Sequence, residues 1–302
     1  MTQLLQIVLM TSLIGLEDIC RRGEKGLLNN IFKTCDESES ESESNSIQSD
    51  EDGKPREPFE AADQCIGIVG DSTLTEFRSS RSGIILNLYQ EREKGIAFQL
   101  WPAAALLCAY IDENTDILTP YQTKKESDGP IIELGAGVGL CGLYVAAYGC
   151  DRVIITDLDV ALPLIERNID ENKSVLRGDG SVRAYELKWG CMEDIDTLFS
   201  QMTYSRTSSG TPPLVIAADC VYWESLFLPF HQTLCALVLG FGCVVLISHV
   251  KRWKRDEKFF AMCRKRMKVE VVKETIEYVK EENSRSDRRR RQISRIYKIT
   301  CK

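Results

Sequence analysis

The stretch Ile131-Ile132-Glu133-Leu134-Gly135-Ala136-Gly137-Val138-Gly139-Leu140 decides the fold of this 302-residue chain. Its first residues are typical of a buried strand, and the glycines that follow let the backbone turn sharply without a Cβ in the way. The helix expected from Leu140 points its N-terminal N–H groups back at this turn. A strand, a glycine turn and a helix in this order indicate a nucleotide-binding site in an α/β protein.

Apolar runs and amphipathic stretches alternate regularly from about residue 66 onwards. Such alternation predicts a parallel sheet with helices on both faces. The expected parallel strands are 131–134, 153–156, 182–187, 214–218 and 243–248, and the expected helices are 101–110, 140–147, 161–173, 194–201, 226–237 and 256–267. Two last strands, 269–273 and 293–300, have no helix between them and predict an antiparallel hairpin at the sheet's edge. We therefore expect an α/β, Rossmann-like fold with a seven-stranded, mostly parallel sheet whose last strand is antiparallel.

Three smaller segments complete the expected organisation. Residues 84–88 alternate apolar and polar side chains and predict a strand or hairpin before the first helix, which Pro102 should start. A polar linker, 112–129, separates that helix from the glycine motif. The basic run Arg288–Arg291 is expected in the loop of the final hairpin as solvated arginines, with a docking or nuclear-localisation role left open.

The beginning of the chain differs in composition from the rest. The net charge of −7 arises from residues 36–52, which hold eight acids and no base and leave 37 acids against 38 bases elsewhere. A Ser/Glu repeat cannot bury enough apolar surface to offset the entropy of ordering. We expect a helical extension at 1–35, a disordered acidic linker at 36–60 and one domain at 66–302. The first residues are apolar but too short a run to span a membrane, and they lack a basic region, so no membrane association is expected.

Cysteine and histidine usage argues against a metal site. The 12 cysteines are scattered without a C-x-x-C pair, and the sequence suggests no partner for the two histidines, His231 and His249. Buried free thiols in a reducing compartment explain the cysteines better than disulfides do. We expect no metal ion, and a cytoplasmic location with the nucleus as an additional one.

An acid ends the second parallel strand. Asp157 lies 20 residues after Gly137, where a carboxylate can accept hydrogen bonds from both hydroxyls of a ribose. The spacing Gly137-x-Gly139-x-x-Gly142 also matches the dinucleotide fingerprint, which leaves a nicotinamide cofactor open. Glu133 favours S-adenosylmethionine, because its carboxylate would attract that cofactor's ammonium and repel a pyrophosphate. The alternative role for Glu133 is to accept hydrogen bonds from loop amides.

The next two strand ends carry aromatic and acidic side chains. Trp189 follows the third strand, where an indole could stack on an adenine ring, although a single tryptophan is more often a core residue. Asp219-Cys220-Val221-Tyr222 follows the fourth strand, at the edge where open α/β sheets bind ligands. Tyr222 could equally be a core aromatic.

Taken together, these residues resemble one family, the seven-β-strand protein-lysine methyltransferases of lysine methyltransferase family 16, of the methyltransferase-like protein 21 type. The resemblance covers about residues 80–300. It rests on Trp101-Pro102, Glu133-Leu134-Gly135-Ala136-Gly137-x-Gly139, Thr156-Asp157-Leu158, Asn168, Asn172-Lys173, Leu187-Lys188-Trp189-Gly190 and Ala218-Asp219-Cys220-Val221-Tyr222 with Glu224 and Pro229. The D-x-x-Y motif with the W-P and L-x-W elements is more specific than the glycine motif, which class I methyltransferases share. The acidic tract departs from the compact family pattern.

The resemblance implies a class I methyltransferase fold and an S-adenosylmethionine-dependent protein-lysine N-methyltransferase. The expected cofactor-binding residues, with Glu133 and Leu158 added from their positions, are Trp101, Glu133, Gly135, Ala136, Gly137, Asp157, Leu158, Trp189 and Ala218. Asp219 and Tyr222 are expected at the methyl-transfer end as the catalytic residues, where they would orient the lysine amine and shape its channel. By analogy with the family, the substrate is a protein such as a chaperone or a translation factor, and the enzyme acts as a monomer.

Three alternative functions stay open on the sequence alone. The chain could methylate a small molecule or a nucleic acid, act as a nicotinamide-dependent oxidoreductase, or serve as an inactive scaffold. An oxidoreductase leaves the D-x-x-Y strand end unexplained, and the complete glycine loop with Asp157 argues against a decayed site. No nucleic-acid partner is expected, because only Arg288–Arg291 offers a basic patch.

Overall fold

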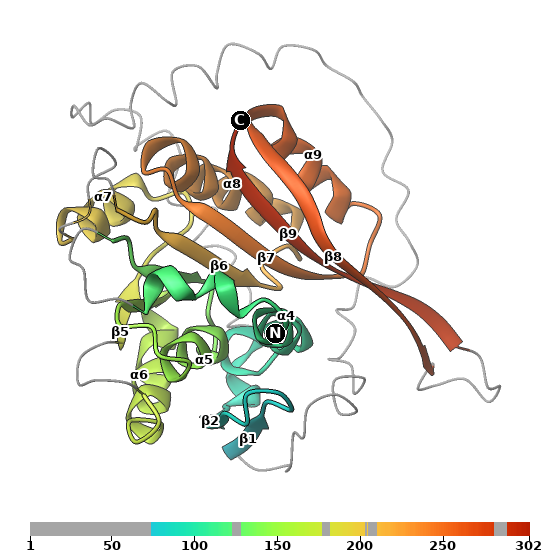
Figure 1. Ribbon diagram of the computed structural model, residues 1–302. Coiled ribbons are helices and arrows are strands. Elements are labelled where there is room, and N and C mark those ends of the chain that lie inside the picture. Colours follow the sequence, from blue (N-terminus) through green and yellow to red (C-terminus); the bar gives the residue numbers. More distant parts are fainter. Residues whose placement is uncertain (1–73, 123–127, 177–181, 203, 205–209, 281–288) are drawn as a thin grey trace. The chain divides into compact units, whose positions relative to one another are not determined.

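The computed structural model describes residues 74–302 except 123–127, 177–181, 203, 205–209 and 281–288 (Figure 1). The expected helical extension 1–35, the acidic linker 36–60 and the start of the domain at 66 lie outside the described residues and stay predictions.

A seven-stranded sheet forms the centre of the fold, in the order β5-β4-β3-β6-β7-β9-β8 (Figure 1). Its strands are β3 (Ile131–Leu134), β4 (Val153–Asp157), β5 (Val182–Glu186), β6 (Leu214–Ala218), β7 (Val244–Lys251), β8 (Met267–Lys280) and β9 (Arg289–Cys301). The strands β3 to β7 pair in parallel, and β9 pairs antiparallel with both β7 and β8. The predicted fold class is therefore confirmed, including the antiparallel last strand.

Helices cover both faces of this sheet (Figure 1). They are α4 (Pro102–Glu113), α5 (Leu140–Ala147), α6 (Leu162–Glu171), α7 (Met192–Ser200), α8 (Phe227–Cys235) and α9 (Asp256–Arg266), with short helical turns at Arg92–Lys94, Ile96–Phe98, Asp159–Ala161, Glu224–Leu226 and Ala236–Gly240. Pro102 opens α4 as expected, because its missing N–H has no partner in a first turn. One core joins α4, α5 and α6 to residues of alternate strand positions, such as Ile131, Ile216 and Leu246.

The segment before α4 is a separate hairpin that two asparagines hold. Strands β1 (Leu74–Arg78) and β2 (Ile85–Tyr89) pair antiparallel, which confirms the predicted early strand or hairpin. At the C-terminal end of α6, the Asn172 side chain bonds both the N–H (2.9 Å) and the C=O (2.7 Å) of Asn87. Asn168 does the same for Tyr89, at 2.7 and 3.2 Å, and also donates to the Val138 carbonyl at 2.9 Å. The two side-chain amides thus make the hydrogen bonds to β2 that a neighbouring strand would make, and Asn168 also connects β2 to Val138 of the glycine loop.

The expectation that residues 112–129 form only a polar linker is wrong for the part that the structure describes. It contains two further short helices, Thr115–Ile117 and Thr119–Tyr121, and Leu118 and Tyr121 are buried in the core. The Tyr121 hydroxyl donates to the Pro212 carbonyl at 2.8 Å, which satisfies its one polar atom. Within residues 112–122, these two side chains join the core although the surrounding composition is polar, and residues 123–127 lie outside the described residues.

The final hairpin is longer than the sequence predicted. Its strands pair from Met267 with Cys301 as far as Lys280 with Arg289, whereas β7 stops where Lys251 pairs with Ile293. Figure 1 shows the two strands continuing past the rest of the sheet as an arm. The expectation that the basic run lies in the loop is wrong for Arg289–Arg291, which belong to β9. An antiparallel pair of strands can extend through backbone hydrogen bonds even where the sequence has no apolar pattern. Arg288 lies outside the described residues.

The described residues contain no helix that is both long and apolar enough to cross a membrane.

Candidate active site

The carboxyl ends of the parallel strands meet at one edge of the sheet and bring the predicted site residues together. Leu134, the last residue of β3, pairs with Thr156 of β4 on one side and Ala217 of β6 on the other. Ala218 in turn pairs with Ser248 of β7. The loops that follow these strands are therefore neighbours, as is general for ligand sites in open α/β sheets.

The glycine loop after β3 adopts a backbone that suits only glycine. Gly135 and Gly137 have φ of 58° and 59°, in the left-handed region. A Cβ on Gly135 would lie 2.6 Å from Cζ2 of Trp189, and one on Gly137 would lie 3.2 Å from the Ala97 carbonyl oxygen. The loop is thus closely packed against both Trp189 and the segment before α4.

Asp157 connects the glycine loop to the loop after β4. Its Oδ2 accepts a hydrogen bond from the Gly137 N–H at 2.7 Å, and its Oδ1 accepts one from the Leu158 N–H at 2.7 Å. Burial raises the pKa of Asp157, while these two backbone donors act in the opposite direction. Each carboxylate oxygen keeps a second lone pair that can accept from a ligand hydroxyl.

Glu133 lies beneath the loop, only 1% exposed. Its Oε2 accepts a hydrogen bond from the Gly142 N–H in the first turn of α5, at 2.7 Å. A Cβ on Gly142 would come within 2.7 Å of the same oxygen, so this close approach requires glycine. Burial raises the pKa of Glu133 to about 8. The sequence left two roles open for Glu133, and this geometry supports the one in which Glu133 accepts a hydrogen bond from a backbone amide next to the loop.

The raised pKa of Glu133 makes the stability of the fold depend on pH. Between its ordinary value of 4.5 and about 8, the folded chain keeps a proton that the unfolded chain has lost. The free energy of unfolding should therefore be highest below this window and fall as pH rises through it, by about 1.4 kcal/mol per pH unit at most. Urea unfolding at several pH values should show this fall in the wild type and a flatter profile in Glu133→Gln. Identical profiles for the two proteins would contradict the assignment.

Two tryptophans stand beside the loop. Trp189 packs against Phe230 of α8, with ring centroids 4.5 Å apart, and is half-buried with its edge at Gly135. Trp101 donates its indole N–H to the Ile96 carbonyl at 2.9 Å. The predicted residues Ala136, Leu158 and Ala218 are also half-buried at this edge.

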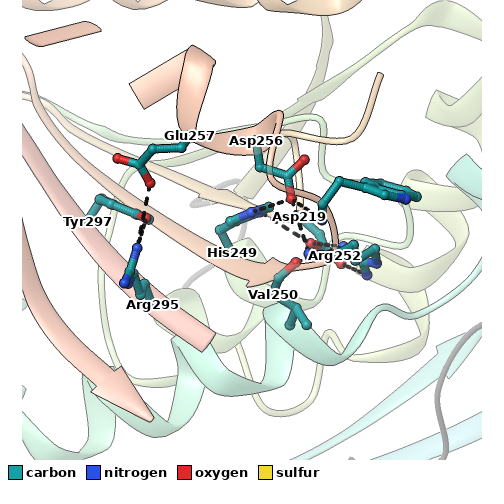
Figure 2. A network of polar contacts seen from close by, with 9 residues as sticks. Asp219, His249, Val250, Arg252, Asp256, Glu257, Arg295 and Tyr297 are labelled. Carbon is teal, nitrogen blue, oxygen red and sulfur yellow. Dashed lines mark hydrogen bonds and ion pairs between the residues drawn. The ribbon is translucent and has the colours of Figure 1, made fainter. Parts of the chain in front are cut away.

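Asp219 is held in a strained turn by an ion pair that the sequence did not predict (Figure 2). Its φ of 60° makes it the one residue other than glycine with a left-handed backbone in the described part of the chain. Its N–H donates to the Ser248 carbonyl at 2.9 Å. Both carboxylate oxygens accept from Arg252, at 2.7 and 2.5 Å, in a two-pronged pair. The Arg252 guanidinium therefore engages both oxygens of this carboxylate.

A second acid and a histidine lie directly behind this pair (Figure 2). The His249 ring is 2% exposed, with Nε2 3.2 Å from Oδ2 of Asp256 and Nδ1 3.9 Å from Oδ1 of Asp219. Burial alone would raise the pKa of Asp256, but His249 and the N–H groups of Arg252 and Trp253 lower it. The expectation that His249 has no partner is therefore wrong. Strand register could have found it, because Ala218 beside Ser248 places residues 219 and 249 together.

The other histidine is structural. His231 is buried on α8, with its Nε2 3.5 Å from Sγ of Cys235 one turn later. Burial lowers the pKa of His231, which favours the neutral ring. No group of three or more His, Cys, Asp or Glu that could hold a metal ion occurs among the residues that the structure describes.

Tyr222 completes the edge. Its ring lies against Trp223, with centroids 5.2 Å apart, and burial raises the pKa of its phenol above the usual range. The hydroxyl therefore stays protonated at any physiological pH. The Arg252 guanidinium, which pairs with Asp219, also lies 5.6 Å from the Trp101 ring centroid. One side chain therefore contacts both an expected catalytic residue and an expected cofactor-binding residue.

A seven-stranded sheet of this order, with glycines at the end of β3 and an acid at the end of the neighbouring β4, defines a class of α/β enzymes that bind a nucleoside cofactor at the sheet's edge. Residues 80–266 match the family model described as lysine methyltransferase. The chain belongs to this family.

Individual relatives agree with the family match. The chain is 36% identical over 179 residues to protein N-lysine methyltransferase METTL21A of Danio rerio, which covers 59% of this chain and 72% of the relative. It is 33% identical over 177 residues to protein-lysine N-methyltransferase EFM6 of Saccharomyces cerevisiae, covering 56% and 69%. It is 34% identical over 167 residues to EEF1A lysine methyltransferase 3 of Mus musculus, covering 55% and 61%.

The resemblance drawn from the sequence is confirmed. The protein is an S-adenosylmethionine-dependent methyltransferase of the protein-lysine N-methyltransferase kind. The oxidoreductase and scaffold alternatives are set aside.

Proposed function

We propose that the strand-end site binds S-adenosylmethionine and presents its methyl group to a lysine held between Asp219 and Tyr222. The observation that carries the proposal is the coupling of Asp157 to the Gly137 N–H, which fixes the glycine loop and a ribose acceptor in one rigid arrangement. The residues assigned to the cofactor are Trp101, Gly135, Ala136, Gly137, Asp157, Leu158, Trp189 and Ala218, with Glu133 supporting the loop from beneath.

The residues present fit such a cofactor. Left-handed glycines at 135 and 137 let the loop turn at the strand end while it packs against Trp189 and Ala97, where a Cβ would be too close. Asp157 offers acceptors for ribose hydroxyls, and the indole of Trp189 offers an apolar wall for a purine. When bound, S-adenosylmethionine supplies a methyl group already activated by a sulfonium, so the protein mainly has to orient the acceptor.

The acceptor side of the site has to receive a neutral amine. A lysine with an ordinary pKa near 10.4 is almost wholly protonated at neutral pH, and desolvation lowers that pKa. The half-buried phenol of Tyr222 is neutral and can hydrogen-bond the amine without stabilising its charge. Because Arg252 occupies both oxygens of Asp219, this carboxylate offers little attraction for an ammonium. We assign the proton to water and assign Asp219 to fixing the turn that positions Tyr222.

The proposed substrate is a translation factor. Of the two protein classes that the sequence analysis expected, this one is supported by the relative in Mus musculus, which is named for EEF1A. A cytoplasmic site of action and a monomeric enzyme belong to the same proposal.

Methylation of purified EEF1A tests the proposal. The protein should bind S-adenosylmethionine in calorimetry, should not bind NAD, and should add methyl groups to a lysine of EEF1A that peptide mass spectrometry can locate. A Tyr222→Ala variant should bind the cofactor and lose most of the transfer. Cofactor binding without methylation of EEF1A would remove this substrate, whereas a folded protein that does not bind the cofactor would remove the site.

A further inference from the structure

Two basic segments that are distant in the sequence lie together beside the candidate active site. Strand β7 ends at Lys251, opposite Ile293 of β9, and continues into the loop Arg252–Arg255. Arg291 lies two residues beyond Ile293, in the direction in which β7 points, because β9 runs antiparallel. Since β7 is parallel to β6, this is also the edge that carries Asp219. Arg291, which belongs to the basic run for which a docking role stayed open, therefore lies toward the edge of the sheet that carries Asp219.

The side chains at this junction are exposed cations and aromatics. Lys254, Arg255 and Arg291 are exposed, and the Arg255 guanidinium lies 4.7 Å from the ring centroid of Trp253. Tyr278, the cross-strand partner of Arg291, is 66% exposed. Across the described residues, no carboxylate lies within ion-pair distance of these three cations. Their charges are therefore available to a partner.

Tyr278 and Arg291 share one face of the final hairpin. Cross-strand partners point to the same side, so three successive pairs line this face: Glu274 with Arg295, Ile276 with Ile293, and Tyr278 with Arg291. Helix α9 covers only the inner end, where Tyr297 stacks on Phe260 with ring centroids 3.7 Å apart and Arg295 lies 3.6 Å from Glu257. The outer pairs extend beyond α9, next to the loop that enters it.

We infer that this surface, which we call the basic rim, docks an acidic segment of the protein substrate. The basic rim consists of Trp253, Lys254, Arg255, Ile276, Tyr278 and Arg291. Carboxylates of the substrate would pair with the three cations, and the aromatic and aliphatic side chains would contact the apolar stems around them. The inference rests on the proposed function, because docking at this edge matters only if the lysine enters beside Tyr222.

The observations favour an acidic protein over a nucleic acid. Outside residues 36–52 the chain holds 37 acids against 38 bases, so its overall charge favours neither partner, and the three cations of the basic rim suffice for a short acidic segment rather than a long phosphate backbone. The rim also includes Ile276, which is 41% exposed, and it adjoins Glu274, whose charge Arg295 neutralises at 2.6 Å. An aliphatic side chain between cations suits a peptide better than a phosphate backbone.

Peptide binding tests the inference with the full-length protein. The probe is a short fluorescein-labelled peptide with a central lysine flanked by glutamates, compared with a peptide in which glutamines replace the glutamates. The acidic peptide should bind more tightly, and its affinity should fall as salt is added. The variant Lys254→Glu/Arg255→Glu/Arg291→Glu should weaken this binding by about tenfold or more. A matched control, Lys265→Glu/Lys268→Glu/Lys298→Glu, reverses three exposed charges elsewhere and should leave it unchanged.

Calorimetry with S-adenosylmethionine on the same variants separates this inference from the proposed function. Unchanged cofactor affinity with weaker peptide binding supports the basic rim. Equal binding of both peptides, or equal loss in the two triple variants, overturns it. Tighter binding of a single-stranded RNA than of the acidic peptide would also overturn it, in favour of a nucleic-acid partner. Failure of every variant and the wild type to bind the cofactor would overturn the proposed function alone.

Discussion

Replacement of Asp157 by alanine should lower the affinity for S-adenosylmethionine by about a hundredfold or more. The change removes the proposed acceptor of the ribose hydroxyls, where hydrogen bonds to a charged group each contribute about 1.5–3 kcal/mol. It also frees the Gly137 and Leu158 N–H groups, which Asp157 now holds at 2.7 Å, so the loop loses its fixed conformation. Isothermal titration calorimetry measures the effect directly.

The matched control for this prediction is Asp159→Ala. Asp159 lies two residues away and is exposed, and its carboxylate bonds only the neighbouring Val160 N–H among the contacts in the described residues. Removing it changes the net charge equally but should leave the cofactor affinity within a few fold. Similar affinities for the two variants and the wild type would show that the ribose is bound elsewhere.

The exchange of Asp219 for asparagine should lower kcat by about a hundredfold while the affinity for the cofactor changes little. Asparagine keeps the shape of the side chain and tolerates a left-handed backbone, so the turn itself can persist. What is lost is the charge that pairs with both nitrogens of Arg252, and with it the position of the segment that leads to Tyr222. Single-turnover transfer of a labelled methyl group, beside calorimetry, separates these two effects.

Two further variants test whether the Asp219–Arg252 pair positions Tyr222 for methyl transfer or only stabilises the fold. Arg252→Lys keeps the cation but cannot form the two-pronged contact, and we expect an intermediate loss of kcat. Glu224→Gln removes an exposed acid of the same segment, which pairs with Lys258 at 3.0 Å, and should have almost no effect. If Asp219→Asn turns over like the wild type and melts at a lower temperature, the pair serves stability alone.

Much of the fold could be predicted because its signals are local. The strands 131–134 and 214–218 and the helix 140–147 agree with the structure at both ends, since a buried strand and the glycines after it carry their own start and stop. The short helices within 115–121 could not be predicted, because Leu118 and Tyr121 are buried through contacts with distant parts of the core. The length of the final hairpin likewise depends on pairing between strands.

The site divides in the same way. The glycines and Asp157 follow from spacing along one βαβ unit, and the structure places them in direct contact. Arg252 and Asp256 could not be identified, because each meets its partner only after β6 and β7 lie side by side. The position after the fourth strand indicated Asp219 and Tyr222, and the family resemblance added their catalytic role, but neither identified the cation that pairs with Asp219.

The left-handed backbone at Asp219 implies a conflict between folding and chemistry at this position. Glycine would relieve the unfavourable φ, which costs about 1–3 kcal/mol for a residue with a side chain. Glycine would also remove the pair with Arg252, so a search for more thermostable versions of this enzyme should accept it only together with a replacement of Arg252, and such a version should lose methyl transfer. Selection for stability alone would therefore remove a residue of the proposed active site. Any engineering of this enzyme should keep residue 219 fixed.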